Sequence, residues 1–312
     1  MFDLILQGII PVIFVIALGF YSGRRKIVSQ EGARSLSTFV VQFAYPCTLF
    51  VATFGFTSKQ LENGPYIAML ILSIMIPFAI AVVVGKRIFK QSLDEAGLFA
   101  CNCGFPSTAV FGLPILKSVF GAVGLLPVIV GSLVTSVLMM PVIIFLVHHG
   151  TPVATGQKQE TFAANMLNTI KQPVVWGPIL GLVLVSAGFR LPLLAKLPLQ
   201  ELGDATGGAA LFTIGVLLSA LKPRFEWSTA VVLLFKNMLM PALALGLGLL
   251  FHVDSILVKG AVIATASPSA SLGAILSSTF MIGQKSIPPQ ILASDLFGVF
   301  SMAFWIYVVE QI

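Results

Sequence analysis

Apolar runs alternate with short polar or charged segments along the whole sequence of 312 residues. Most of these runs are about as long as the ~20 residues that a helix needs to cross the hydrocarbon core of a bilayer. The segments between them hold most of the charged residues. We therefore expect ten membrane-spanning helices, at about 4–21, 36–54, 66–84, 97–116, 125–147, 173–189, 207–221, 230–251, 256–280 and 291–309.

Two of the ten runs contain a proline among small polar residues, where an unbroken helix is not expected. The run 97–116 holds Gly104 and Pro106, and the run 256–280 holds Pro268 between serines. Proline cannot donate the backbone hydrogen bond that a helix requires, and glycine weakens the turn before it. Irregular backbone at membrane depth is tolerated only where it is buried in protein or faces a water-filled cavity. We therefore predict that both breaks line a functional site.

Three proline pairs recur at nearly the same separation, which indicates an internal duplication. The pairs are Pro11 with Pro173 and Pro106 with Pro268, each 162 positions apart, and Pro77 with Pro241, 164 positions apart. Interrupted hydrophobic segments at corresponding places in two halves are a good sequence indicator of a transporter binding site. Because five spans per repeat is an odd number, the two repeats must be inverted. We expect a first repeat at 1–150, a cytoplasmic linker at 151–171 and a second repeat at 172–312.

Composition and charge place the chain in a membrane. The sequence is 57% hydrophobic and only 10% charged, with a mean hydropathy of +1.00, whereas soluble domains carry roughly 25% charged residues. Alternate connecting segments, starting with the one that contains Arg24, hold twelve lysines and arginines, and the opposite side holds five. By the positive-inside rule, this bias predicts a multi-pass protein of the cytoplasmic (inner) membrane with both termini outside the cytoplasm. The net charge of +6 belongs mainly to these loops, so no nucleic-acid partner is expected.

Polar residues inside the spans are functional candidates, because a charge near the bilayer centre costs about 2.5–3.5 kcal/mol on insertion scales. Lys236 lies well inside the eighth span, where it can supply a counter-charge to an anion or extend its ammonium group to the cytoplasmic interface. Asp295 in the tenth span can bind a coupling cation or proton, pair with Lys236, or cap the start of a helix. Gln42, in the second span, is the other coupling-ion candidate.

The helix breaks supply binding groups that need no charged side chain. A half-helix that begins after a break presents free amide groups and about half a positive elementary charge, which suits a carboxylate. On the other side of the break, free carbonyl groups can bind a cation. Alternatively, the hydroxyl groups near the breaks only satisfy the backbone groups that the breaks set free. The substrate-binding candidates are Asn102, Pro106, Ser107, Thr108, Lys236, Ser267, Pro268, Ser269 and Ser271.

The sequence lacks the signatures of common enzymes and metal sites. It contains no P-loop, no Gly-x-Ser-x-Gly and no His-Glu-x-x-His motif. Cys47, Cys101 and Cys103 have no nearby histidine or further cysteine that would complete a zinc site. We therefore expect no enzymatic activity, no bound metal and no cofactor.

Several short motifs together resemble the bacterial branch of the auxin efflux carrier family, part of a wider group that includes bile acid sodium symporters. The motifs extend over the chain and are 11–20, 102–104, 112–114, 172–176 and Pro268. The resemblance implies that the broken fourth and ninth helices of the two inverted repeats cross each other. It also implies that spans one, two, six and seven form a scaffold, and that the other spans move against it as a transport domain.

The expected fold class is an all-α integral membrane protein, with ten transmembrane helices in two inverted five-helix repeats and broken, crossing helices four and nine. The expected function is that of a secondary transporter for a small organic anion that works by alternating access. The resemblance implies a mono- or dicarboxylate such as malonate or malate. Proton or sodium coupling and a homodimer are left open. The alternatives are a ten-span sensor or structural protein without transport, and a sodium-coupled carrier of a larger amphipathic anion.

Overall fold

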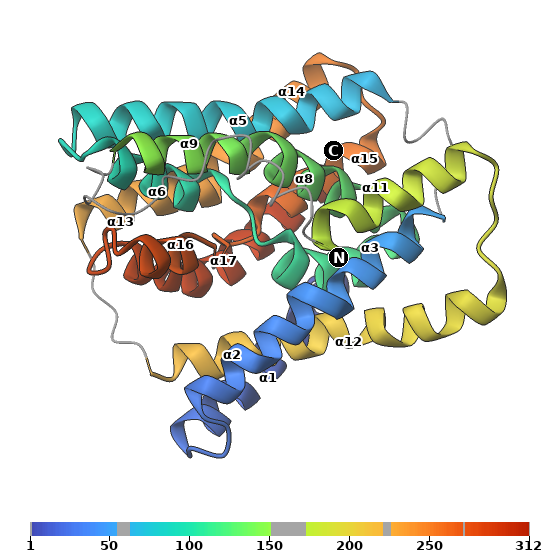
Figure 1. Cartoon of the computed structure of the whole chain (residues 1–312). Coiled ribbons are helices and arrows are strands. Elements are labelled where there is room, and N and C mark those ends of the chain that lie inside the picture. Colours follow the sequence, from blue (N-terminus) through green and yellow to red (C-terminus); the bar gives the residue numbers. More distant parts are fainter. Residues whose placement is uncertain (1, 55–62, 151–172, 221–225, 271, 312) are drawn as a thin grey trace.

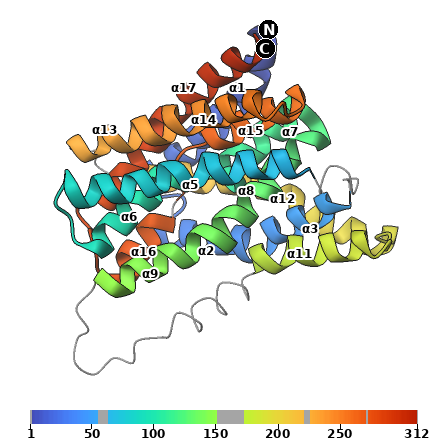
Figure 2. The ribbon, with the colours of Figure 1, turned by 90° about the horizontal axis from the view of Figure 1, so that it is seen from above.

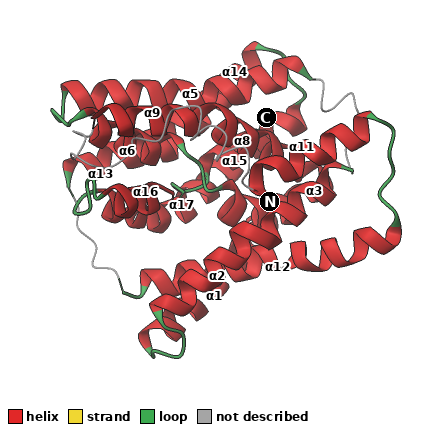
Figure 3. Cartoon of the chain, in the orientation of Figure 1, coloured by secondary structure: helices red, strands yellow, loops and turns green. Residues whose placement is uncertain are grey.

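The computed structural model describes residues 2–54, 63–150, 173–220, 226–270 and 272–311 of the chain. These residues are almost entirely helical, and Figure 3 shows no strand among them. The expected linker at 151–171 lies outside the described residues. The helical elements of the first half are α1 (Phe2–Arg24), α2 (Gln30–Phe39), η1 (Val40–Ala44), α3 (Tyr45–Thr53), α5 (Gly64–Arg87), α6 (Leu93–Gly104), η2 (Thr108–Gly112), α7 (Leu113–Phe120), η3 (Gly121–Leu125), α8 (Leu126–Leu133), η4 (Val134–Met139) and α9 (Met140–Gly150). Those of the second half are α11 (Pro173–Ser186), α12 (Leu193–Leu218), α13 (Trp227–Leu234), η5 (Phe235–Leu239), α14 (Met240–Leu250), α15 (Ser255–Ala266), α16 (Leu272–Phe280) and α17 (Ile287–Glu310).

Six helices within the described ranges are long and apolar enough to cross a membrane. They are Gln30–Thr53, Gly64–Arg87, Val123–Val147, Leu193–Leu218, Trp227–Leu250 and Ile287–Glu310. Shorter apolar helices lie at Ile13–Arg24, Trp176–Ser186 and Ser255–Ala266. The prediction of a helical membrane protein is confirmed. The count of ten spans and the inverted arrangement of two repeats stay predictions.

The seventh expected span differs from the structure at its start. The apolar pattern placed this start near residue 207, but α12 begins at Leu193. The first turns of α12 contain Lys196, Gln200 and Glu201, which are good helix formers although they are polar. Hydropathy alone therefore missed the polar beginning of this helix.

Wide helical turns precede four of the prolines inside the spans. The π-helical turns η1, η2, η4 and η5 each end two residues before a proline, namely Pro46, Pro114, Pro141 and Pro241. In η1, the amide of Tyr45 donates to the carbonyl oxygen of Val40, five residues earlier, and Met240 donates to Phe235 in the same way. A proline ring clashes with the carbonyl group four residues before it, and the wider turn accommodates this clash. At Pro46 in the second expected span, where proline predicts a kink, the structure has a π turn.

The described helices pack in two groups (Figures 1 and 2). Helices α1, α2, α3, α11 and α12 contact one another and form the α12 group. Helices α5–α9 and α13–α17 form the α15 group, named after its central helix. Nine of the twelve residues of α15 are buried, which explains why its sequence is apolar all round. The groups meet where α1 contacts α7 and α17, where α12 contacts η2, and where α11 contacts α8.

Glycines allow α1 and α12 to approach closely within the α12 group. A Cβ atom at Gly19 would lie 2.1 Å from the carbonyl oxygen of Phe212, and one at Gly215 would lie 2.1 Å from that of Ile16. Small residues at such contacts let the backbones of membrane helices touch, and packing then replaces the hydrophobic effect that lipid cannot provide. The backbones of α1 and α12 are therefore in direct contact at these glycines.

Candidate functional site

The two predicted helix breaks meet each other in the structure. Helix α6 ends at Gly104 and α15 ends at Ala266, and the segments that follow form an antiparallel bridge between Pro106 and Ser269. The amide of Ser107 donates to the carbonyl oxygen of Pro268 at 2.8 Å, and the amide of Ala270 donates to that of Phe105 at 2.9 Å. Each break thus satisfies backbone groups that the other sets free. We call this contact the crossing site.

The expectation of free amide groups after the breaks is wrong for two residues. The amide of Ser107 is used by Pro268 across the bridge, and the amide of Ser269 donates to Ser294 Oγ at 2.9 Å. The hydroxyl group of Ser269 donates to the carbonyl oxygen of Asn102 at 2.6 Å. Because the partners come from distant parts of the chain, local sequence could not reveal them. The Ser269 hydroxyl therefore satisfies a backbone carbonyl group near the break. This agrees with the alternative interpretation, in which the hydroxyl groups only satisfy the backbone.

Asn102 connects three helices next to the crossing site. Its Nδ2 donates to the carbonyl oxygen of Ile287 at 3.2 Å and to Gln290 Oε1 at 3.0 Å, and Gln290 Nε2 donates to Ser228 Oγ at 3.1 Å. Its Oδ1 is buried and has no hydrogen-bond partner in the described part of the chain. A Cβ atom at Gly273 would lie 2.1 Å from this oxygen. A free acceptor inside a packed protein can take a proton donor or a cation.

The remaining polar candidates of the two breaks are also buried. Ser107, Thr108 and Ser267 expose little or no surface, and Ser267 Oγ has no hydrogen-bond partner among the described residues. A Cβ atom at Gly112 would lie 2.9 Å from Ser267 Oγ, so glycine gives this hydroxyl its space. Ser271 lies outside the described residues.

Lys236 is completely buried beside the crossing site, so its ammonium group does not extend to the protein surface. It lies on the π turn η5, and its Nζ donates to the carbonyl oxygen of Thr265 and lies 3.3 Å from Met240 Sδ. Thr265 belongs to the last turn of α15, where unpaired carbonyl groups carry the negative end of the helix dipole. The ammonium group therefore lies at the carbonyl end of a half-helix and not at an amide end.

The two coupling-ion candidates are not brought together. Asp295 is the ninth residue of α17, which begins at Ile287, so the helix-start interpretation is wrong. Its side chain is buried, and no ion pair joins it to Lys236 within the described residues. Gln42 is exposed on η1 in the α12 group, whereas the crossing site is buried. Of these two residues, only Asp295 adjoins the crossing site, through its neighbour Ser294.

A face of α17 that the sequence analysis missed covers the crossing site. Ser301 Oγ and Trp305 Nε1 both donate to the carbonyl oxygen of Asn237 at 2.8 Å, and a Cβ atom at Gly298 would lie 2.4 Å from Pro268 Cγ. These residues continue the row of Gln290 and Ser294 at spacings of three and four, which place them on one face of a helix. The polar and small residues at 290, 294, 298 and 301, in an otherwise apolar span, were the signal for this face.

Comparison with known proteins gives the family. A family model described as membrane transport protein matches residues 4–306, nearly the whole chain. The chain belongs to this membrane transport protein family. The resemblance to the auxin efflux carrier family is thereby confirmed.

Three named relatives of this membrane transport protein match it over most of their length. The "Uncharacterized transporter YfdV" of Escherichia coli is 27% identical over 312 residues, with 99% of this chain and 98% of the relative covered. The "Uncharacterized transporter MJ1031" of Methanocaldococcus jannaschii is 24% identical, with 95% and 96% covered. The "Putative malonate transporter" of Rhizobium meliloti is 22% identical, with 97% and 95% covered. The likeness thus extends over at least 95% of each protein.

The crossing site gives this membrane transport protein a buried centre of mixed chemistry. Lys236 contributes a cation, and Asn102 Oδ1 and Ser267 Oγ contribute oxygens without partners in the described part of the chain. A cation in a water-poor site attracts anions more strongly than it would in water. Irregular backbone at this place is stabilised by protein contacts instead of lipid. The crossing site thus combines one buried cationic side chain with two buried oxygen atoms that lack partners in the described part of the chain.

Proposed function

We propose that the protein is a secondary carrier that moves a small organic anion across the cytoplasmic membrane by alternating access, and that it is not an enzyme. The substrate class is a mono- or dicarboxylate such as malonate or malate. The observation that carries the proposal is the fully buried Lys236 at the meeting point of two broken helices. The name of the Rhizobium meliloti relative supports the same substrate class.

The positive charge of Lys236 supports an anionic substrate. A lysine placed inside a membrane span without a carboxylate partner is costly, and such residues usually mark the path of a substrate or ion. Among the described residues, Lys236 has only a carbonyl oxygen and a thioether sulfur as hydrogen-bond acceptors. An anionic substrate can offset the uncompensated positive charge. We assign substrate binding to Lys236 together with the side chains of Asn102 and Ser267 at the crossing site.

The division into two helix groups supports alternating access, because this mechanism needs one part of the protein to move against another. The α12 group corresponds to the expected scaffold, and the α15 group contains both breaks and Lys236. Rigid-body movement of one bundle against another around a central site is common in carriers built from repeats. We propose that the two inverted repeats, 1–150 and 172–312, each contribute helices to both groups, with five spans in each repeat.

Uptake into proteoliposomes tests the proposed function. The purified protein is expected to give saturable accumulation or counterflow of radiolabelled malonate or malate, and protein-free liposomes are expected to give none. Imposed sodium and pH gradients, tested separately, identify the coupling ion. The absence of saturable flux for every mono- and dicarboxylate would support a sensor or structural protein. Flux that requires sodium and only a larger amphipathic anion would replace the proposed substrate class.

The proposed orientation places both termini outside the cytoplasm and the segment 151–171 inside it. A single cysteine introduced at Gln157, in a background without the three native cysteines, should resist an impermeant thiol reagent in intact cells. Labelling should appear after the membrane is permeabilised. The physical reason is the excess of basic residues on that side of the chain. Ready labelling of Gln157→Cys in intact cells would reverse the orientation.

A further inference from the structure

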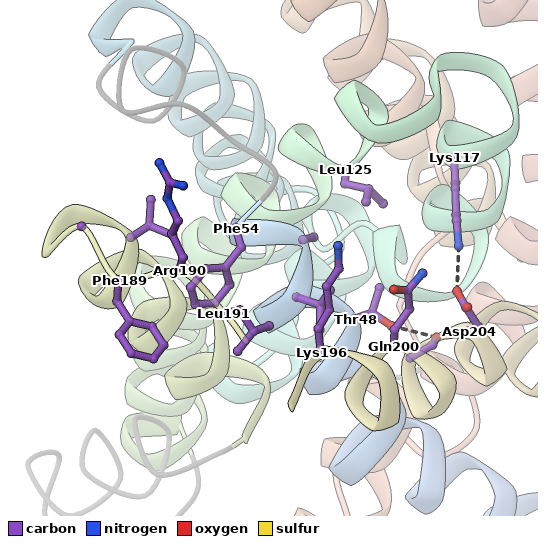
Figure 4. A pocket seen from close by; sticks show the side chains of 15 residues that line it. Thr48, Phe54, Lys117, Leu125, Phe189, Arg190, Leu191, Lys196, Gln200 and Asp204 are labelled. Carbon is purple, nitrogen blue, oxygen red and sulfur yellow. Dashed lines mark hydrogen bonds and ion pairs between the residues drawn. The ribbon is translucent and has the colours of Figure 1, made fainter. Parts of the chain in front are cut away.

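A pocket of about 690 Å³ lies away from the crossing site, at the contact between the two helix groups (Figure 4). Its walls come from the end of α3, the start of α12, the segment between α11 and α12, and α7 with η3. The apolar part of the wall includes Val51, Phe54, Phe189 and Leu191. Helix α7 belongs to the α15 group, whereas α3 and α12 belong to the α12 group. The pocket is thus shared by both groups.

Positive charge predominates among the residues that line this pocket. Three cationic side chains, Lys117, Arg190 and Lys196, face one carboxylate, Asp204, which gives the wall a net charge of +2. Lys196, Gln200 and Asp204 follow one another at intervals of four on α12, and this spacing places them on one face. Concave sites lined by one sign of charge raise the local concentration of counter-ions. The polar wall of the pocket is therefore suited to an anion.

The carboxylate of Asp204 is already engaged, which leaves two cations available. Lys117 Nζ lies 2.8 Å from Asp204 Oδ1 and joins α7 to α12. Within the described part of the chain, neither Arg190 nor Lys196 forms an ion pair or a hydrogen bond through its side chain. Figure 4 shows these two side chains extending in the same direction from separate parts of the wall. An arginine fork matches the geometry of a carboxylate, and a nearby lysine adds a second positive charge.

We propose that this pocket is a second anion-binding site, which takes a small mono- or dicarboxylate through Arg190 and Lys196. Gln200 adds a side-chain amide to the same wall. The site is separate from the crossing site and needs no contact with Lys236. In the proposed orientation it opens to the outside of the cytoplasm, where it collects the anion before the anion reaches the crossing site. The headgroup of an anionic lipid shares this chemistry, so the test must separate the two sources.

Quenching of a fluorophore by iodide reports the local anion concentration without any transport. The label is attached at Leu191→Cys in a background with Cys47→Ser, since Cys101 and Cys103 are fully buried. The protein is reconstituted in neutral phosphatidylcholine, and iodide is compared with uncharged acrylamide. The double variant Arg190→Gln/Lys196→Gln is expected to lower quenching by iodide roughly threefold and to leave quenching by acrylamide unchanged. Lys259→Gln, on the same predicted side but outside the pocket, is the matched control and should change neither.

Protection by malonate then tests binding. Millimolar malonate should reduce quenching by iodide in the parent protein and should have no effect in the double variant. Quenching by iodide that is equal in parent and double variant, or a parent that malonate does not protect, would overturn the proposal. Addition of phosphatidylglycerol is expected to leave the protection by malonate in place; loss of protection would assign the pocket to a lipid headgroup instead. Because no step requires flux, failure here is distinct from failure of the proposed carrier function.

Discussion

Lys236→Gln is expected to raise the malonate concentration for half-maximal uptake at least about tenfold, a loss of roughly 1.4 kcal/mol of binding free energy. The reason is the charge that glutamine lacks. At an effective dielectric constant near 20, a unit charge pair 4 Å apart is worth about 4 kcal/mol before desolvation, so a fraction of this is measurable. Glutamine keeps a polar amide NH₂ group of similar size on the side that faces the carbonyl oxygen of Thr265, which Lys236 contacts, so the fold should persist. Labelled uptake, normalised to folded protein, gives the constant.

The control for this variant is Lys259→Gln, which removes a lysine of α15 and leaves Lys236 in place. Lys259 lies on α15 and is only partly buried, so its loss should change the same constant less than about twofold. A structural role for Lys236 would appear as a lower melting temperature with unchanged affinity. Wild-type affinity in Lys236→Gln would thus limit this lysine to capping the carbonyl end of α15.

The positions of the breaks could be predicted from the sequence because their causes are local. Proline lacks the amide hydrogen that a helix needs, so Pro106 and Pro268 mark the interruptions in any context. The structure places the end of α6 at Gly104 and the end of α15 at Ala266, two residues before each proline. The π turn before Pro46 follows from the same property of proline. Each of these interruptions is determined by a few adjacent residues, so the sequence is enough to locate it.

The partners of the breaks could not be predicted, because they lie far away in the sequence. The amide of Ser107 finds the carbonyl oxygen of Pro268, 161 positions later, and Ser269 finds Ser294 on α17. Local reasoning leaves both amides free and assigns them to a ligand. It also cannot tell that Lys236 faces the carbonyl end of α15. The chemistry of each residue was readable from the sequence, but its neighbours were not.

The sequence could not predict which polar residues of the spans are buried near the crossing site. Gln42 and Asp295 are similar in sequence terms, as single polar residues in apolar runs, yet Gln42 is exposed and Asp295 is buried. Which face of a helix turns inward depends on the packing of its neighbours when the apolar pattern covers all faces. In α17, polar and small residues at spacings of three and four mark the inward face. Polar or small residues repeated at spacings of three and four are therefore a stronger sequence signal for a buried polar face than a single polar residue in an apolar run.

At the two breaks, the irregular backbone competes with a regular helix, and the prolines favour the irregular form. Pro106→Ala and Pro268→Ala each restore an amide and remove a steric clash, a change of about 3 kcal/mol in favour of regular helix. The two hydrogen bonds of the bridge, from Ser107 and from Ala270, oppose this change. Each is worth about 0.5–1.5 kcal/mol, so at most they balance it. We therefore expect either variant to close its break in part.

Either proline variant is accordingly expected to lower the maximal rate of malonate uptake at least about fivefold, although no charge is removed. Pro77→Ala is the matched control, because Pro77 lies inside the unbroken helix α5 and its replacement should leave the rate within about twofold. Uptake is measured in proteoliposomes with equal amounts of folded protein, and the loss should appear in both proline variants. If Pro106→Ala and Pro268→Ala both transport as the parent does, the geometry of the breaks is not required for movement of the anion. The binding site would then have to lie away from the bridge between Pro106 and Ser269.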